Sequence, residues 1–343
     1  MPNMKIETTN DVMNLLRIYI ASAALGTALE LGLFWRLAEK PLAIKEISQK
    51  FNIPFDRCRY WLELLTGLGL LEHRGETYSP SSTAHSAILG VYSLETWTQL
   101  AQEARERYQA GNNLTLHISH PDSVWVAQGT EPPRWFNQIM DSPKRAERFT
   151  RMLYELHRPL AEKVAQTLDM TGVKQLMDLG GGSGVVSLAL LKRHSNLIAV
   201  VVDIDNVCKT GREIANETPM ANRITYHAAD FLQDELPIGF DMILECDVAI
   251  YSEELFSKLR RALNEKGRLV IVSNLDDFSS WFEHAQSKLS LLGLMDSFLS
   301  SLEGSRVTKT TIEDVKNRLT KVGFHNISEQ IWEDGTIILQ AHK

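Results

Sequence analysis

The sequence predicts an α/β fold, a doubly wound sheet of mostly parallel strands, joined to a mainly helical N-terminal region. From Lys174 onward, short apolar strands alternate with helical segments, which is the pattern of a parallel sheet covered on both faces. A glycine-rich turn follows the first of these strands. Near the end of the chain, Asp334-Gly335 separates two further strands and predicts an antiparallel hairpin at one edge of the sheet.

Length and composition predict a soluble globular protein of two domains. The chain has 343 residues, of which 44% are hydrophobic and 23% are charged. The net charge of −7 disfavours a nucleic-acid partner. Cys58, Cys208 and Cys246 form no CxxC pair, so we expect no disulfide framework and a reducing, cytoplasmic location.

The first third of the chain is expected to be helical around one small hairpin. Asn10 is a plausible helix cap. The uncharged run Ile18–Leu29 is shorter than the roughly 20 residues that span a bilayer, so we expect no membrane span but a buried helix at a subunit contact. Leu70–Tyr78 predicts two short strands around Arg74-Gly75, and two helices followed by such a hairpin form a winged helix.

A winged helix often binds DNA, so its charge helps to decide between DNA binding and a structural or dimerisation role. From Pro41 to His85 the sequence contains five basic and five acidic residues, a balance of zero. A face that binds phosphates needs an excess of cations. We therefore expect this region to dimerise and not to bind nucleic acid.

Three regions are expected along the chain: a dimerisation domain at 1–100, a helical connector at 101–170 that lines a pocket, and a ligand-binding domain at 171–343. The expected strands of the last region are Gln175–Leu179, Leu197–Val202, Ile224–Ala228, Asp241–Glu245, Leu269–Ser273, Asn326–Trp332 and Thr336–His342. Two of the helices expected between them are Val185–Arg193 and Glu253–Ala262.

The sharpest motif is Asp178-Leu179-Gly180-Gly181-Gly182-Ser183-Gly184, between a strand and a helix. Glycines at the carboxyl end of a strand let the backbone approach a ligand closely. The spacing departs from the dinucleotide fingerprint GxGxxG because the third spaced glycine comes one residue early. Asp178 would repel a pyrophosphate and suits instead a ligand with an ammonium group.

Acidic residues also follow the next two strands. Asp203 lies where an acid can accept hydrogen bonds from ribose hydroxyls, and Asp205 is a poorer candidate for that role. Asp230 offers an acceptor for an exocyclic amine, and Phe231 offers an apolar wall for a base. Three acids at one rim of the sheet favour a ligand site over three unrelated surface loops.

These residues resemble the class I S-adenosylmethionine-dependent methyltransferases, and more narrowly the small-molecule O-methyltransferases with an N-terminal winged-helix dimerisation region. The resemblance spans nearly the whole chain, from Leu31-Gly32-Leu33-Phe34 through the glycine motif to Val322-Gly323-Phe324. It implies a Rossmann-like seven-stranded sheet with a C-terminal antiparallel hairpin. It also implies S-adenosylmethionine as cofactor and a homodimer whose N-terminal helices help to close each other's pockets.

The resemblance implies particular contacts to this cofactor. Gly180 and Gly182 would lie near its methionine part, Asp203 would bind its ribose, and Asp230 and Phe231 would surround its adenine. Asp178 and Cys246 complete the expected cofactor-binding set. The acceptor would be a small aromatic or polycyclic metabolite, in an apolar pocket lined by Phe136, Met140 and Trp281.

The general base of this family is a histidine after the fourth strand, and this sequence has Ile250 at that position. The glutamate that supports this histidine in the family is also replaced, because its position is occupied by Arg306 or Val307. Three explanations stay open: another residue is the base, the acceptor needs no strong base, or the protein keeps the cofactor without transferring its methyl group.

The nearby candidates for a base are Tyr251, Asp247 and Glu245, of which the first two are favoured. The acceptor atom is therefore open among oxygen, nitrogen and carbon. We expect no metal site, because the ten histidines show no ligand spacing such as HxH or HExxH.

Overall fold

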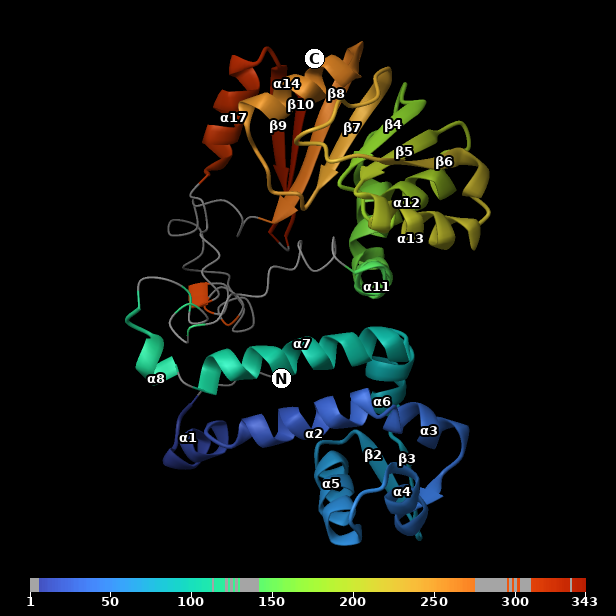
Figure 1. Cartoon of the computed structure of the whole chain (residues 1–343), viewed down its shortest axis with the longest axis vertical. Helices are drawn as coiled ribbons and strands as arrows, with labels where there is room; N and C mark the ends of the chain where they lie inside the picture. Colours follow the sequence, from blue (N-terminus) through green and yellow to red (C-terminus); the bar gives the residue numbers. More distant parts are fainter. Residues whose placement is uncertain are drawn as a thin grey trace. The chain divides into compact units, whose positions relative to one another are not determined.

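The computed structural model describes residues 6–112, 114–120, 142–274, 310–333 and 335–343, together with isolated positions between 123 and 302. The chain divides into two compact units, Met1–Gln128 and Gly129–Lys343, coloured from blue to green and from green to red in Figure 1. The division of the sequence at residues 100 and 170 stays a prediction.

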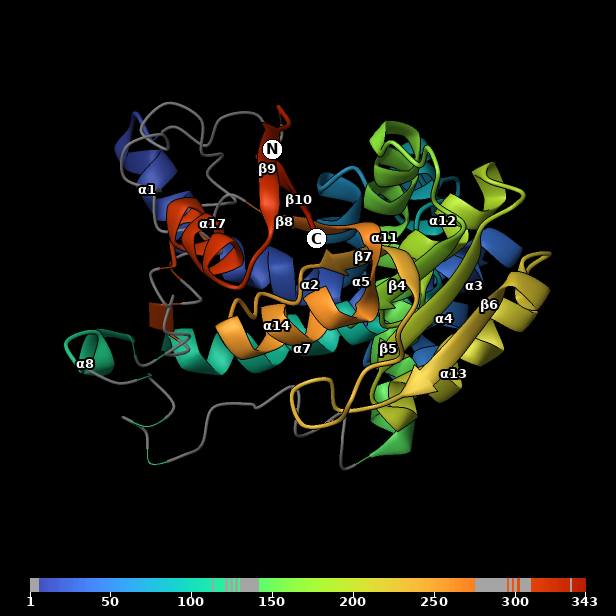
Figure 2. The ribbon, with the colours of Figure 1, turned by 90° about the horizontal axis from the view of Figure 1, so that it is seen from above.

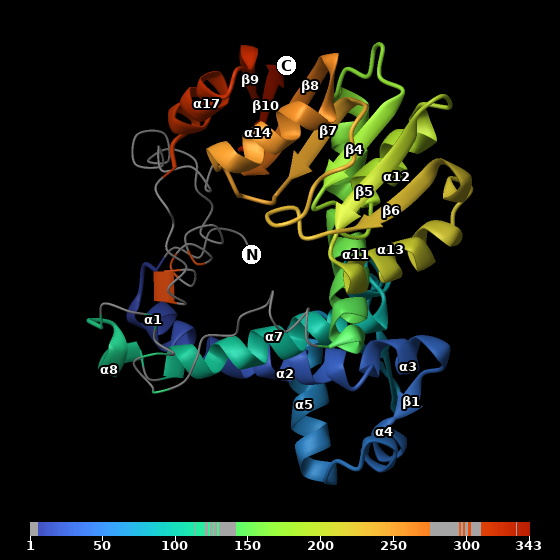
Figure 3. The ribbon, with the colours of Figure 1, turned by 45° about the horizontal axis from the view of Figure 1, so that its top comes forward.

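The N-terminal unit is mainly helical. Its described elements are α1 (Thr9–Leu15), α2 (Ile18–Glu30), α3 (Leu33–Glu39), β1 (Leu42–Ala43), α4 (Ile44–Phe51), α5 (Phe55–Gly67), β2 (Leu71–Arg74), β3 (Thr77–Pro80), α6 (Ser82–Ala84), a π-helical turn (His85–Leu89), α7 (Leu94–Asn112) and α8 (Leu114–His117). The helices α2 and α7 lie side by side (Figure 3). Strands β2 and β3 form the predicted hairpin, with Gly75 in the turn at φ 61°.

The predicted cap of the first helix is wrong. Thr8, and not Asn10, caps α1, and Asn10 lies within the first helical turn. The Thr8 hydroxyl accepts a hydrogen bond from the Asp11 N–H at 3.2 Å, while the Asp11 carboxylate accepts one from the Thr8 N–H at 2.8 Å. Each side chain thus satisfies a backbone donor that the helix leaves unpaired, and this reciprocity selects Thr8.

The predicted helix at Ile18–Leu29 is confirmed as α2, and its predicted burial at a subunit contact stays a prediction. Only Ala28 and Leu29 of α2 are buried within the chain. Several apolar residues of α1 and α2 are exposed instead, as is Leu16, which caps the end of α1. We define the N-terminal apolar surface as the residues Val12, Met13, Leu16, Ile18, Tyr19 and Ile20. By length and composition alone Thr9–Glu30 could cross a membrane, a test that many core helices and signal sequences also pass.

The C-terminal unit has the predicted α/β architecture. Its described elements are α11 (Pro143–Thr167), β4 (Gln175–Leu179), α12 (Val185–Arg193), β5 (Ile198–Asp203), α13 (Asp205–Asn216), a 3₁₀ turn (Ala221–Arg223), β6 (Ile224–Ala228), β7 (Phe240–Cys246), α14 (Glu253–Ala262), β8 (Leu263–Asn274), α17 (Ile312–Lys321), β9 (His325–Ile331) and β10 (Thr336–His342).

The sheet has seven strands in the order β6-β5-β4-β7-β8-β10-β9. β4 pairs in parallel with β5 and β7, whereas β10 is antiparallel to both β8 and β9, as the hairpin signal predicts. The chain builds outward from β4 to β6 and then returns to β7 on the other side of β4. This reversal creates the crevice at the carboxyl ends of the strands where open α/β sheets bind ligands.

Helices cover both faces of this sheet (Figure 2). The helices α11, α12 and α13 contribute buried residues to one apolar core, and α14 and α17 contribute to the other. β8 begins at Leu263, earlier than the predicted Leu269. The strand is irregular near this start, because Phe240 pairs with Leu263 but Met242 pairs with Arg268.

Candidate functional site

The glycine loop lies at the reversal point of the sheet, between the end of β4 and the start of α12. Gly180, Gly182 and Gly184 have φ values of 62°, 57° and 75°, a region that side chains other than glycine rarely adopt. A Cβ added to Gly182 would meet no atom within 4 Å. The loop therefore offers open space beside the half-buried backbone of Gly182, as close approach of a ligand requires.

Asp203 ties this loop to the end of β5. Its Oδ2 accepts a hydrogen bond from the Gly182 N–H at 2.8 Å, and its Oδ1 accepts one from the Ile204 N–H at 2.7 Å. Burial raises the pKa of the Asp203 carboxyl, and the two N–H donors oppose that rise. The carboxylate is half-buried and keeps lone pairs for a further donor, which suits a ligand hydroxyl.

Gly180 is packed against two other loops at the same rim. A Cβ at this position would come within 2.5 Å of Val248 Cγ2 and 3.8 Å of Phe231 Cε1. The turn that carries Phe231 is held by Lys258 of α14, whose Nζ donates to the carbonyl oxygens of Phe231, Leu232 and Asp234 at 3.3, 2.9 and 2.9 Å. Nothing in the pattern of α14 predicts this contact.

Asp230 has an exposed side chain at the beginning of that turn. Its Oδ1 accepts a hydrogen bond from the Leu232 N–H at 3.0 Å, which shapes the turn. Phe231 is half-buried beside Gly180. The structure thus brings the loops of Gly180, Phe231 and Val248 together at one rim.

Asp178 lies beneath the glycine loop and is 1% exposed. A Cβ on Gly181 would come within 2.5 Å of its Cγ, so the carboxyl and the loop backbone are packed together. Asp178 Oδ2 accepts a hydrogen bond from Ser187 Oγ at 2.7 Å, while its Oδ1 has no hydrogen-bond partner. Its contacts therefore support the loop from below, and burial raises the pKa of the Asp178 carboxyl to about 6.

The raised pKa of Asp178 predicts that ionisation of its carboxyl lowers the free energy of unfolding as the pH rises. The folded chain holds the proton more tightly than the unfolded chain, whose carboxyl has the ordinary value of 3.8. The stability contributed by protonation is thus complete below about pH 4 and is lost as the pH rises through 6. Relative to wild type, Asp178→Asn should gain roughly 2.4 kcal/mol between pH 4 and pH 7. Urea unfolding of both proteins at the two pH values measures this gain, and a constant difference would contradict the prediction.

The loop after β7 carries the candidate bases. Glu245 is 2% exposed, and its Oε1 accepts hydrogen bonds from the Val248 N–H at 2.8 Å and the Ala249 N–H at 3.0 Å. Asp247 is exposed at the start of the loop, with φ 58° and its N–H donating to the Val272 carbonyl oxygen at 3.0 Å. Ile250 packs against an apolar core, so its position holds no proton acceptor.

Tyr251 and Cys246 are enclosed more than Asp247. The Tyr251 ring is 7% exposed within the core, and its hydroxyl donates to Ser273 Oγ at 3.3 Å. Burial, and after it the carboxylates of Asp247, Asp178 and Glu245, raise the pKa of the Cys246 thiol well above its usual value. A thiol that is uncharged in this way is suited to packing and not to nucleophilic attack.

Some predicted residues lie outside the described residues: Phe136, Met140, Trp281, Arg306 and Val307. Within the part of the chain that the structure describes, no group of three or more histidine, cysteine, aspartate or glutamate side chains is placed to hold a metal ion. The contacts of Val248 and Lys258 to the glycine rim were missed by sequence reasoning, because they join segments far apart in the chain.

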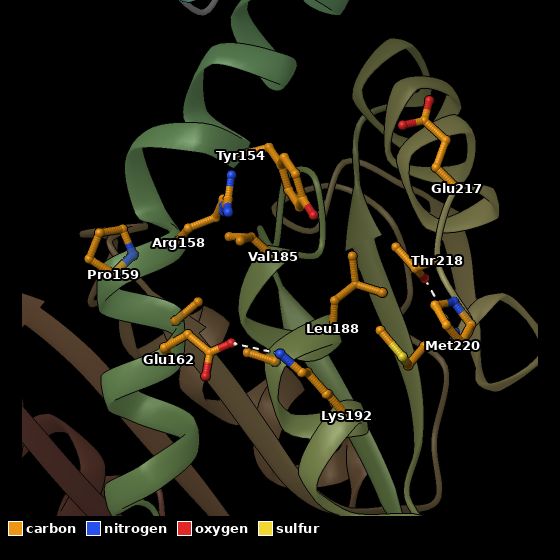
Figure 4. A pocket seen from close by; sticks show the side chains of 13 residues that line it. Tyr154, Arg158, Pro159, Glu162, Val185, Leu188, Lys192, Glu217, Thr218 and Met220 are labelled. Carbon is orange, nitrogen blue, oxygen red and sulfur yellow. Dashed lines mark hydrogen bonds and ion pairs between the residues drawn. The ribbon is translucent and has the colours of Figure 1, made fainter. Parts of the chain in front are cut away.

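A hollow of about 610 Å³ lies elsewhere, between α11, α12 and the turn at residues 217–220 (Figure 4). Tyr154 and Arg158 of α11 face Val185 and Leu188 of α12 across it (Figure 4). An ion pair between Glu162 and Lys192, 3.6 Å apart, crosses one end. None of the predicted site residues lines this hollow, so it is not part of the glycine-loop site.

Comparisons with known proteins agree with this geometry. Residues 113–324 match the O-methyltransferase domain family, and residues 13–89 match the O-methyltransferase dimerisation domain. The N,N-dimethyltransferase OxyT of Streptomyces rimosus is 26% identical over 89% of this chain and 90% of its own length. The 3-hydroxy-5-methyl-1-naphthoate 3-O-methyltransferase of Streptomyces sahachiroi is 32% identical over 64% of this chain and 62% of its own.

Solved structures show the same fold. Human N-acetylserotonin methyltransferase in complex with S-adenosylmethionine superimposes with a TM-score of 0.77 at 18% identity, covering 100% of this chain and 99% of that one. Because the O-methyltransferase domain matches more than half of the residues, the chain belongs to the O-methyltransferase family. It is an S-adenosylmethionine-dependent methyltransferase with an N-terminal dimerisation domain.

Proposed function

We propose that the chain methylates a small aromatic or polycyclic metabolite at the rim formed by the glycine loop and the loops after β5, β6 and β7. The observation that carries the proposal is the glycine loop itself. Its Gly182 N–H donates to the Asp203 carboxylate, and the space beside Gly182 is open. A Cβ at this position would occupy part of that space. The two relatives described above, by their names, methylate nitrogen in one case and the oxygen of a naphthoate in the other.

The residues at this rim fit the cofactor. Asp203 would accept hydrogen bonds from the ribose hydroxyls, Phe231 would lie against the adenine, and Gly180 and Gly182 would border the methionine part. The bound cofactor supplies an electrophilic methyl group on a sulfonium. The role proposed for Asp178 is indirect, because its buried carboxylate holds the start of α12 through Ser187. Cys246, once expected in the binding set, is proposed as a packing residue.

The chain's own contribution to the transfer is to hold donor and acceptor in line and to exclude water. The absence of a histidine base is consistent with an acceptor that needs no strong base, such as an amine, an activated carbon or an already acidic hydroxyl. Ile250 supports this, because the side chain at the position of the family's histidine packs against an apolar core and cannot accept a proton. If the acceptor does lose a proton to the protein, Asp247 is the better candidate, since it is exposed and Tyr251 is not.

Two measurements on the purified chain test this function. Titration calorimetry with S-adenosylhomocysteine should show binding at one site per chain. Incubation with S-adenosylmethionine and a panel of aromatic amines, phenols and carbon acids should give a product heavier by one methyl group in the mass spectrum. Calorimetry without any heat of binding would overturn the cofactor assignment. A converted product without a methyl gain would favour the non-methylating alternative.

The N-terminal apolar surface points to a homodimer. Leu16 and Tyr19 are 66% and 59% exposed, and every residue of the surface except Val12 lies within the matched dimerisation domain. Exposed apolar patches of this kind mark sites of association. Leu16→Glu with Tyr19→Glu should therefore convert a dimer of twice the chain mass of 38.8 kDa into a monomer, as light scattering measures. A wild-type monomer would contradict the proposal.

A cytoplasmic location, expected from the cysteines, also stays a proposal.

A further inference from the structure

The loop after β7 has a conformation that its own residues do not favour. Asp247 and Ala249 have φ values of 58° and 56°, and neither is a glycine. Such a conformation is unfavourable for a residue other than glycine, and two such residues in one short loop persist only when surrounding contacts hold them. The loop borders the glycine rim, because Val248, which lies between Asp247 and Ala249 in the chain, contacts Gly180 through its Cγ2.

Glu245 supplies the contact that holds this loop. Its carboxylate is buried at the end of β7 and accepts two hydrogen bonds from the loop backbone, at 2.8 Å from the Val248 N–H and 3.0 Å from the Ala249 N–H. Without this carboxylate, the Val248 and Ala249 N–H groups would lose their acceptor, and the loop would lose the two hydrogen bonds that hold it. A buried carboxyl group without hydrogen-bond partners is costly, so its presence here calls for such donors.

We propose that Glu245 is a positioning residue of the methyltransferase site. It holds the 247–250 loop in the conformation that packs Val248 against Gly180 and places the Asp247 carboxylate at the surface of the rim. Its own carboxylate is 2% exposed, so it acts through the loop and not by contact with the acceptor. The role of the loop in methyl transfer rests on the proposed function. The contact by which Glu245 holds the loop does not depend on it.

The chain offers a matched control at the other end of the same strand. The Asp241 carboxylate accepts hydrogen bonds from the Lys174 N–H at 2.9 Å and the Gln175 N–H at 3.0 Å. Like Glu245, Asp241 thus binds two backbone N–H groups, and it also accepts a hydrogen bond from the Asn264 side-chain amide at 2.9 Å, at the amino end of β7 and away from the glycine rim. Asp241→Leu removes that contact, and Glu245→Leu removes the one at the rim.

Amide hydrogen exchange and calorimetry separate the two roles. In Glu245→Leu, a peptide covering residues 246–252 should exchange at least about tenfold faster, and S-adenosylhomocysteine should bind at least about tenfold more weakly, since two hydrogen bonds are lost. Glu245→Gln keeps an acceptor oxygen and should stay within about threefold of wild type in both measurements. Asp241→Leu should lower the melting temperature while leaving both measurements within about threefold.

Two outcomes would overturn the proposal: a folded Glu245→Leu protein with wild-type exchange and affinity, or an Asp241→Leu protein with equal losses at the 246–252 peptide. Failure of the proposed function looks different. In that case wild-type protein would not bind S-adenosylhomocysteine, while the exchange experiment would still report whether Glu245 holds the loop.

Discussion

Gly184→Ala should lower the free energy of unfolding by about 3 kcal/mol, because the new methyl group meets both an unfavourable backbone angle and a filled space. Gly184 has φ 75°, and its Cβ would lie 2.6 Å from the Tyr226 hydroxyl oxygen and 3.2 Å from Val201 Cγ2. The Tyr226 hydroxyl donates to the Ser183 carbonyl oxygen at 2.8 Å, so the ring cannot move aside without losing that bond. Urea unfolding followed by circular dichroism measures the change.

Gly172→Ala is the control for this experiment. Gly172 has φ 79°, but a Cβ there would meet nothing within 4 Å. This variant therefore carries only the backbone cost, about 1–2 kcal/mol. Equal losses in the two variants would show that Tyr226 and Val201 yield readily and that the close approach of α12 to the sheet does not require a glycine.

Asp203→Ala should weaken the binding of S-adenosylhomocysteine by about tenfold to a hundredfold in titration calorimetry. Two contacts are lost together: the proposed acceptor of the ribose hydroxyls, and the hydrogen bond at 2.8 Å that holds the Gly182 N–H. A hydrogen bond to a charged group contributes about 1.5–3 kcal/mol, and 1.4 kcal/mol corresponds to a factor of ten, so the loss of one bond to the ribose accounts for the expected range.

Asp205→Ala tests whether this loss is specific to position 203. Asp205 is exposed in the first turn of α13, so its replacement removes the same charge two residues away without touching the glycine loop. Its affinity should stay close to that of wild type. Equal weakening in both variants would assign the effect to the general electrostatic field, and an unchanged Asp203→Ala protein would remove this residue from the site.

Local patterns predicted most of the C-terminal sheet. Gln175–Leu179, Ile224–Ala228 and Thr336–His342 are strands with the predicted bounds, because apolar runs between turn residues carry the signal within a few positions. The glycine motif was predicted with its helix at Val185–Arg193 for the same reason. Asn10 and Thr8 show the limit of such reasoning. Both residue types cap helices, and the return contact from Asp11 decides between them.

The site was less predictable, because its contacts join distant segments. Asp178 reads as a ligand-facing acid in the sequence, but α12 brings Ser187 over it and the carboxyl is buried. Tyr251 follows a strand end as a catalytic tyrosine would, yet Ser273 on the neighbouring strand binds its hydroxyl in the core. The apolar run in α2 predicts burial, and only the fold of the N-terminal unit shows that most of it is exposed within one chain.

The sequence by itself determined the class of fold, the position of the glycine loop and the acids that follow β5 and β6, since each depends on periodicity and on residues close in the chain. Only the tertiary structure decided which polar groups face the rim and which support it. The packing of β7 against β4 carries Val248 to Gly180 and lets the buried Glu245 hold that loop. Burial and hydrogen bonding across strands set these roles, and neither can be read from the order of residues along one strand.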